Sequence, residues 1–143
     1  MDKKDILLLT VNASQTKSLT PVQLQKSLFL ISQAKLPELP EDIYLFEPYH
    51  YGPFCVDIYS DAEQLQKLGL LIRVPSPIGS WTNSVVTASG AQKASELEKA
   101  ISAENLKFIQ AIVSWVQSLS FSQLVKTIYQ IYPQFRQNSV FQG

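Results

Sequence analysis

The sequence contains one cysteine, one histidine and no long hydrophobic run. A single cysteine cannot form an internal disulfide, and chains without disulfides are typical of reducing compartments, so we expect a cytoplasmic protein. No apolar stretch approaches the roughly 20 residues that a membrane-spanning helix needs, which predicts no membrane segment. The apolar residues near the start are soon interrupted by polar ones, so we do not expect a secretory signal peptide.

The scarcity of histidine, cysteine and glycine also limits the chemistry. A zinc site normally takes four nitrogen or sulfur ligands, or three and a water, so one histidine and one cysteine are too few. None of the five glycines precedes Gly52, and they are scattered, so no glycine-rich phosphate loop is present. Glu96 and Glu98 lie two residues apart on an expected helix and point to different sides, so they do not form a catalytic carboxylate pair. We therefore expect no metal, no cofactor and no catalytic residues.

Charge of one sign is not in surplus either. The chain carries 12 basic and 12 acidic residues, a formal net charge of zero. A dedicated nucleic-acid-binding protein usually has a basic surplus, because cationic side chains displace the counterions of the phosphates. Hydrophobic residues make up 45% of the 143 residues, which is enough apolar mass for the core of one domain.

Local capping signals predict where helices begin. Thr20, Pro21 and Gln23 form a capping box with proline at the first helical position, where its missing N–H costs nothing. Ser120 and Gln123 repeat the same box. Apolar residues recur at helical spacing after these starts, which indicates amphipathic helices. Helices are expected over residues 3–12, 21–34, 53–68, 88–101, 103–118 and 120–132.

Three segments are expected to be extended. Residues 43–48 are mainly aromatic and aliphatic, but Pro48 cannot donate to a ladder, so this segment is predicted to be an edge strand or a strand end. Residues 70–74 and 81–87 are typical of two strands, and the proline, serine and glycine between them are typical of a turn. This pair is predicted to form a hairpin.

Three helices followed by a two-stranded hairpin have the layout of a winged helix, in which the hairpin is the wing. We therefore predict a mainly α (α+β) fold with a winged-helix-like core over residues 1–87. A C-terminal helical extension over residues 88–133 would pack back on this core, followed by a tail over 134–143. Together they are expected to form a single domain over residues 1–143.

Several segments in this order resemble one known family. The text LTPVQLQKSLFL at 19–30 resembles the opening of the Panacea (SocA-like antitoxin) domain, which typically has K-L-Q-K-L-L-[FY] there. YGPF at 51–54 resembles that family's Y-G-P-[FV] block, and the T-x-x-G turn at 87–90 also fits. L-V-x-x-I-Y-x-x-Y-P at 124–133 is similar to the closing pattern of the family. The likeness covers roughly residues 6–133.

The resemblance implies a helical, winged-helix-like protein of bacterial or phage origin that binds a toxin or delivers one to a protease. Two features depart from the family pattern: Cys55 stands where serine is frequent, and the expected wing is short. We therefore predict a non-enzymatic protein-interaction module, with antitoxin-like neutralisation or adaptor binding of a toxin-like or protease-related partner as its form. A homodimer is an open alternative.

The segment YHYGPFC, residues 49–55, holds the only histidine and the only cysteine. A thiolate near a helix N-terminus can have a lowered pKa, and a neighbouring imidazole can lower it further, so His50 and Cys55 could form a catalytic pair. The scaffold interpretation is stronger, because no third group orients the histidine and a half-buried cysteine usually packs as a small hydrophobe.

In the scaffold interpretation this segment is a hinge that sets the angle of the third helix. Gly52 lets the chain turn from extended to helical, and Pro53 fixes φ in the first helical turn. Phe54 then enters the core. Tyr49 and Tyr51 flank the bend, and together with His50 they are predicted to contact a partner if they face water.

A winged-helix DNA-binding transcriptional regulator is the alternative function, since such proteins can read the major groove with the third helix. That helix carries Asp57, Asp61 and Glu63 against Lys67, and the wing offers only Arg73. Three acids against one base would repel phosphates, which disfavours DNA. Four dispersed lysines of the first two helices are expected to form a solvated face rather than a basic patch. They are Lys3, Lys4, Lys17 and Lys26.

The fifth helix has more apolar residues than a surface stripe needs, which predicts a central core helix. A partner groove or a dimer contact through Trp115 is the alternative. Exposed aromatic residues near the wing tip would be natural hot spots for binding. The partner-binding candidates are Tyr49, His50, Tyr51, Asp57, Asp61, Ile78, Trp81 and Trp115.

Overall fold

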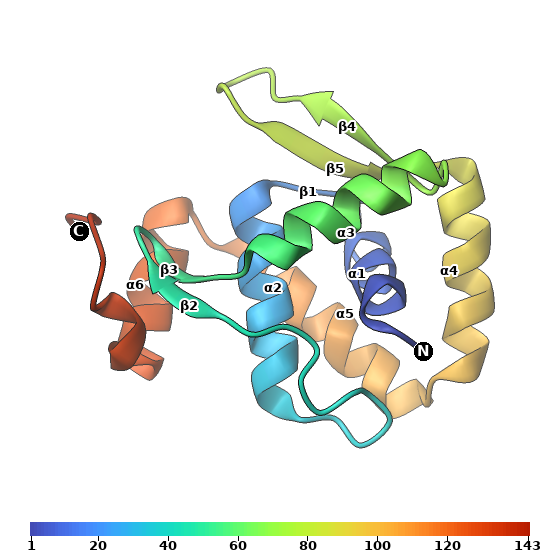
Figure 1. Ribbon diagram of the computed structural model, residues 1–143, viewed down its shortest axis with the longest axis horizontal. Helices are drawn as coiled ribbons and strands as arrows, with labels where there is room; N and C mark the ends of the chain where they lie inside the picture. The colour runs from blue at the N-terminus through green and yellow to red at the C-terminus, as the bar shows by residue number, and fades with distance from the viewer.

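Six α-helices and two small antiparallel sheets alternate along the chain, which the computed structural model describes from residue 1 to residue 143 (Figure 1). The mixed α+β class predicted from the sequence is thus confirmed, and each expected helix is present. In chain order the elements are α1 (Lys3–Asn12), β1 (Ser18–Leu19), α2 (Pro21–Ala34), β2 (Glu47–Tyr49), β3 (Gly52–Phe54), α3 (Val56–Lys67), β4 (Leu71–Pro75), β5 (Thr82–Val86), α4 (Ala88–Ala100), α5 (Ala103–Ser118), α6 (Phe121–Ile131) and the 3₁₀ helix η1 (Pro133–Arg136).

Helix α1 lies at the centre of the main core. Every residue from Ile6 to Asn12 is buried, as expected of a helix that is apolar nearly all round. It contacts α2, α3, α4 and α5 as well as strand β5, and Figure 1 shows it enclosed by them. Asp2 and Asp5 form a capping box that starts the helix, and their polar ends remain at the surface.

Helix α2 joins the main core to a second, smaller one. The predicted capping box is present, since the Thr20 hydroxyl accepts from the Gln23 amide at 3.2 Å. Leu28 packs into the main core, whereas Phe29 belongs to a second cluster with residues of α5 and α6. The Phe29 ring makes edge-to-face contacts with three other rings, which fixes the end of the chain against α2. They are Phe46, Tyr132 and Phe135.

The three-stranded sheet has the order β1-β5-β4 and contains the hairpin expected from the sequence. Strands β4 and β5 pair antiparallel, with Leu71 opposite Val86 and Pro75 opposite Thr82. Strand β1 was not predicted, because two residues are too few to show an alternating pattern. Strand β4 lies at the edge of the sheet, and its apolar side chains beyond Leu71 are exposed.

The hinge predicted at residues 52–54 is wrong in its geometry. Gly52, Pro53 and Phe54 do not open a helix; they form strand β3, which pairs with β2 in a second sheet. Helix α3 begins later, with Cys55 as its N-cap residue rather than its third helical residue. The reason is a tertiary contact. The Gln25 side chain donates to the Cys55 carbonyl and accepts from the Cys55 amide, both at 2.9 Å, and so holds this residue extended.

Only the end of the predicted strand at 43–48 pairs in the structure, because β2 covers Glu47–Tyr49. The preceding residues are irregular, and Ile43 and Tyr44 are buried in the main core. Phe54 does not enter that core as predicted. Its ring stacks on Tyr49 at 4.9 Å and lies 5.6 Å from the ring of Tyr59, partly exposed.

Helix α5 packs one face on α2 and α1 and so belongs to the core, but it is not the central helix that its apolar content predicted. The carboxylate of Glu38 accepts from the Ser102 amide at 3.1 Å and from the Asn105 side chain at 2.8 Å, and so caps the start of α5. The opposite face of α5 is exposed, including Trp115. No helix of the protein combines the length and the apolar character needed to cross a bilayer.

The tail after η1 packs on the β2–β3 hairpin. The Val140 amide donates to the His50 carbonyl at 2.9 Å, and the Asn138 side chain donates to the Pro48 carbonyl at 3.2 Å. The Phe141 ring lies 6.2 Å from that of Phe121. Figure 1 shows the C-terminal segment, in red, beside this hairpin and α6. The end of the chain therefore supports the hairpin from outside.

Candidate functional site

An apolar groove of about 550 Å³ opens between three elements that are far apart in the sequence. One wall is the turn of the β4–β5 hairpin, the second is the first turn of α2, and the third is the corner between α5 and α6. We call it the hairpin groove. Its hydrophobic lining is Val22, Ile78, Trp81, Leu119, Phe121 and Leu124.

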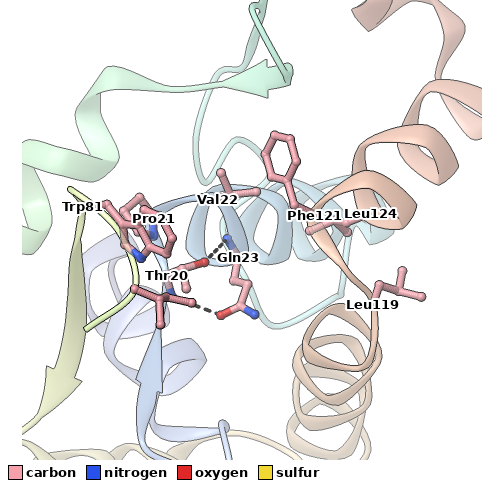
Figure 2. Close-up of a pocket in the computed structure, with 9 residues that line it drawn as sticks. Thr20, Pro21, Val22, Gln23, Trp81, Leu119, Phe121 and Leu124 are labelled. Carbon is pink, nitrogen blue, oxygen red and sulfur yellow. Dashed lines mark hydrogen bonds between the residues drawn. The ribbon is translucent and has the colours of Figure 1, made fainter. Parts of the chain in front are cut away.

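Two helix starts give the hairpin groove its fixed walls. The Thr20–Gln23 capping box satisfies the first amides of α2, and Pro21 needs no partner at the first helical position. Figure 2 shows this box, with its two dashed hydrogen bonds, between Trp81 on one side and Phe121 on the other. The wall across the groove begins at the corresponding capping box of α6. The groove is therefore built on helix termini whose hydrogen bonds are already satisfied.

Three large apolar side chains of the groove are exposed. Ile78 is 84% exposed and Trp81 is 38% exposed, and both project from the hairpin turn. Phe121 is also exposed, on the facing wall. The indole N–H of Trp81 donates to the Asn83 side chain at 3.0 Å, and its six-membered ring packs against Gly79, so the ring is held in place at the edge of the groove. A cluster of large exposed apolar residues in a concave surface is typical of a binding site.

A second, smaller cavity of about 170 Å³ lies between α2 and the β2–β3 hairpin, and it contains a buried lysine. The prediction that Lys26 belongs to a solvated face is wrong, because this residue is only 3% exposed. Its Nζ donates to the Pro53 carbonyl at 3.0 Å. Burial lowers the pKa of this amine to about 8. Four of the rings around it are Tyr49, His50, Tyr51 and Tyr59.

The two cavities adjoin each other at the start of α2. Pro21 and Val22 line both of them. Phe121 lines the hairpin groove and Tyr51 lines the lysine cavity, and their rings meet edge to face with centroids 5.1 Å apart. A ligand that extends over Val22 can therefore contact both cavities.

The possible catalytic pair is held in two different environments. Cys55 is buried, and burial raises the pKa of its thiol, which is the opposite direction from that of a reactive thiolate. His50 is exposed, and its ring stacks on Tyr49 with centroids 4.2 Å apart. The geometry therefore supports a packing role for the cysteine and a surface role for the histidine.

The two acidic residues of α3 that were predicted to contact a partner differ in their exposure. Asp57 is exposed, and its carboxylate lies 4.0 Å from Lys3 Nζ. Asp61 is buried, and it accepts a hydrogen bond from the Tyr44 hydroxyl at 2.7 Å. The prediction that Asp61 contacts a partner is therefore wrong, since its carboxylate is committed inside the protein.

The remaining candidates gather in two places and leave one apart. Ile78 and Trp81 come together in the hairpin groove, whereas Tyr49, His50 and Tyr51 line the lysine cavity. Trp115, 37% exposed on α5, lines neither. Sequence reasoning missed the other apolar members of the hairpin groove, which are Val22, Leu119, Phe121 and Leu124, and it missed Lys26 and Tyr59 of the lysine cavity.

A signal for Lys26 was present in the sequence. Val22, Lys26 and Phe29 recur at the i, i+4, i+7 spacing of one helix face, and Phe29 is fully buried. The position of Lys26 between two apolar residues on that face indicates a buried lysine rather than a solvated one. No comparable local signal pointed to Phe121, whose place in the groove depends on how α6 packs.

Comparison with known proteins returned no match: no protein-family model, no curated protein and no solved structure matches this chain. The two cavities are therefore interpreted from their own residues. No three histidine, cysteine, aspartate or glutamate side chains gather in a group that could hold a metal ion. What the site offers chemically is apolar surface, aromatic ring faces and one buried amine.

Proposed function

We propose that this protein is a non-enzymatic protein-interaction module whose hairpin groove receives apolar side chains of a partner polypeptide. The observation that carries this proposal is the exposure of Ile78, Trp81 and Phe121 around one concave surface. Each square ångström of apolar surface that a partner covers there is worth on the order of 25 cal/mol. Tryptophan in a pocket that becomes desolvated is a frequent hot spot of protein interfaces.

The shape of the groove favours a polypeptide. Its volume of about 550 Å³ can accept several side chains, and it lies between three separate elements rather than inside one of them. The hairpin that carries Ile78 and Trp81 has an exposed edge strand, β4. A bound segment can therefore bury apolar side chains in the groove and also approach unpaired backbone groups of the sheet.

The order of elements supports a winged-helix-like core, because three helices, α1 to α3, precede the β4–β5 hairpin. In this proposal the hairpin is the wing, residues 88–133 are the helical extension, and residues 134–143 are the tail, all within one domain. The resemblance to the Panacea domain is kept as part of the proposal. It makes a toxin-like or protease-related protein the expected partner, and neutralisation or adaptor binding the expected outcome.

A DNA-binding regulator is less well supported by the charges. Helix α3 exposes Asp57 and Glu63 against Lys67. Of the four lysines considered for a basic patch, Lys26 is buried, and Lys17 Nζ donates to the Asn12 carbonyl at 2.6 Å. These arrangements leave few cations to contact a phosphate backbone.

The test is to purify the tagged protein from its native host, identify co-purifying proteins by mass spectrometry, and reconstitute the complex from purified components. Calorimetry then compares the wild type with Trp81→Ala and with the matched control Trp115→Ala, since the two tryptophans are 38% and 37% exposed. We expect Trp81→Ala to weaken binding at least about tenfold and Trp115→Ala to change it less than about twofold. Loss with Trp115→Ala alone would place the interface on α5. Recovery of DNA that elutes in salt, with no stoichiometric protein, would favour the regulator.

A further inference from the structure

We infer that Lys26 binds a carboxylate, and that this carboxylate belongs to the same polypeptide segment that fills the hairpin groove. This inference rests on the proposed function and specifies the chemistry of the partner: an apolar segment that carries an aspartate, a glutamate or a free C-terminal carboxylate. It assigns the lysine cavity as the polar end of a site whose apolar end is the hairpin groove.

The charge of the buried Lys26 amine is unbalanced. A lysine ammonium has three N–H donors, and Lys26 Nζ has one acceptor, the Pro53 carbonyl. No carboxylate of the protein pairs with it, because the single ion pair of the structure joins Lys3 and Asp57. Buried charges in proteins are normally paired, since an unpaired one is costly to desolvate. An incoming carboxylate would supply the missing counter-charge and two acceptor atoms.

The lining of the lysine cavity suits an anion. None of its ten lining residues is acidic, so nothing in it would repel an anion. The lining includes three tyrosines, Tyr49, Tyr51 and Tyr59, a residue type whose hydroxyl can donate to a carboxylate oxygen. The volume of about 170 Å³ is well below the roughly 300–1,000 Å³ of a typical small-molecule site, and suits the end of one side chain or of one chain.

The lysine cavity adjoins the hairpin groove. Pro21 and Val22 line both cavities. The ring of Tyr51, from the lysine cavity, meets the ring of Phe121, from the hairpin groove, with centroids 5.1 Å apart. A segment that places apolar side chains against Val22 and Phe121 therefore brings its next residue to the amine.

The experiment uses two small probes of nearly the same shape, 4-phenylbutyrate and its neutral amide, titrated into the full chain at about pH 7, where an amine with a pKa of about 8 is mostly protonated. NMR follows the indole N–H of Trp81 for the hairpin groove and the Cε and Nζ resonances of Lys26 for the lysine cavity. We expect the acid to bind at least about tenfold more tightly than the amide, and to shift the Lys26 resonances when the amide does not.

Lys26→Met keeps the length of the side chain and removes its charge, and should abolish the preference for the acid. Lys126→Met, at an exposed lysine of α6, is the matched control and should keep it. If Lys26→Met does not fold, the difference between the Lys26 NMR shifts that the acid and the amide cause in the wild type tests the carboxylate site.

The outcomes separate this inference from the proposed function. Equal binding of acid and amide, with shifts at Trp81 only, would overturn the carboxylate site and leave the groove intact. Shifts at Lys26 from the acid, with no shift at Trp81 from either probe, would support the carboxylate site and count against the groove. No shift at either residue would overturn both.

Discussion

The hydroxyl of Tyr44 donates a 2.7 Å hydrogen bond to the carboxylate of Asp61, and both side chains are buried. Tyr44 comes from the irregular segment after α2, and Asp61 from the middle of α3. The bond therefore fastens a segment without regular structure to a helix of the core. It also explains why an aspartate occupies an inward position of α3. The Asp61 bond and burial together raise the pKa of the Tyr44 phenol, with burial as the larger cause.

Removing either partner of this pair should destabilise the fold. Tyr44→Phe leaves the Asp61 carboxylate buried without its donor, and we expect it to lower the free energy of unfolding by about 2–3 kcal/mol. Asp61→Asn keeps an acceptor and should lower it by about 1 kcal/mol. Urea denaturation of both variants and of the double variant measures the coupling between them, expected at about 1–2 kcal/mol. Asp57→Asn, exposed on the same helix, is the control and should lower the free energy of unfolding by less than about 0.5 kcal/mol, through its exposed ion pair with Lys3. Additive losses would mean that the two side chains act independently.

Gly90 should be irreplaceable for a steric reason. A Cβ at this position would lie 2.0 Å from the Leu70 carbonyl oxygen, a backbone atom that cannot move aside freely. Gly90→Ala should therefore destabilise by about 3 kcal/mol or more, through overpacking where α4 meets the hairpin. Gly69→Ala meets open space and suffers only from its φ of +77°, so it should lower the free energy of unfolding by about 1 kcal/mol. Thermal unfolding of the two variants checks this order, and equal losses would contradict the steric explanation.

Helix boundaries could be predicted from the sequence wherever the signal is local. Thr20, Pro21 and Gln23 determine the start of α2 through their own hydrogen bonds, so the predicted box appears in the structure unchanged. Gly52 and Pro53 carry an equally local signal for a helix start, yet they form a strand. The difference is Gln25, which holds the Cys55 backbone extended from 30 residues away. Propensity is overruled there by a buried side chain whose position depends on the whole fold.

In the candidate site, too, local sequence signals could be read and contacts that depend on the whole fold could not. Ile78 and Trp81 were predicted as contacts because exposed aromatic and apolar residues near the wing tip would be natural hot spots. Phe121 and Val22 could not be assigned to the same groove, since they meet only after α6 has packed beside α2. Asp61 was misplaced because an acidic residue is usually taken as exposed, and only the position of Tyr44 shows otherwise.

The thiol of Cys55 should be unreactive in the folded protein. Its side chain is buried and the pKa of its thiol is raised by burial, so little thiolate is present and little of it is accessible. We expect a thiol-reactive disulfide reagent to label it at least about a hundredfold more slowly than in the urea-unfolded chain. Gln25→Ala, which removes two buried hydrogen bonds to Cys55, should speed labelling, whereas His50→Ala should not change it. Rapid labelling that slows with His50→Ala would instead indicate an activated cysteine–histidine pair.

The free energy of unfolding should rise with pH between about 8 and 9.5 because of Lys26. Burial lowers the pKa of this amine from 10.5 to about 8 in the folded protein. Between these two values the unfolded chain binds more protons than the folded one, so raising the pH favours the folded state. The full interval corresponds to at most about 3 kcal/mol, at 1.36 kcal/mol for each pH unit. Urea denaturation at several pH values measures this slope.

The rise of the free energy of unfolding with pH has an upper limit, which the tyrosines set. The pKa values of Tyr44 and Tyr59 are raised in the folded protein, so above about pH 10 the unfolded chain loses their protons first and stability falls again. Below that limit the rise should vanish in Lys26→Met and persist in Lys126→Met. A flat wild-type profile would mean that the Lys26 amine is hydrated rather than desolvated, and the unbalanced charge that attracts a carboxylate would then be absent. A rise that 4-phenylbutyrate suppresses would show that a bound carboxylate keeps the buried amine protonated.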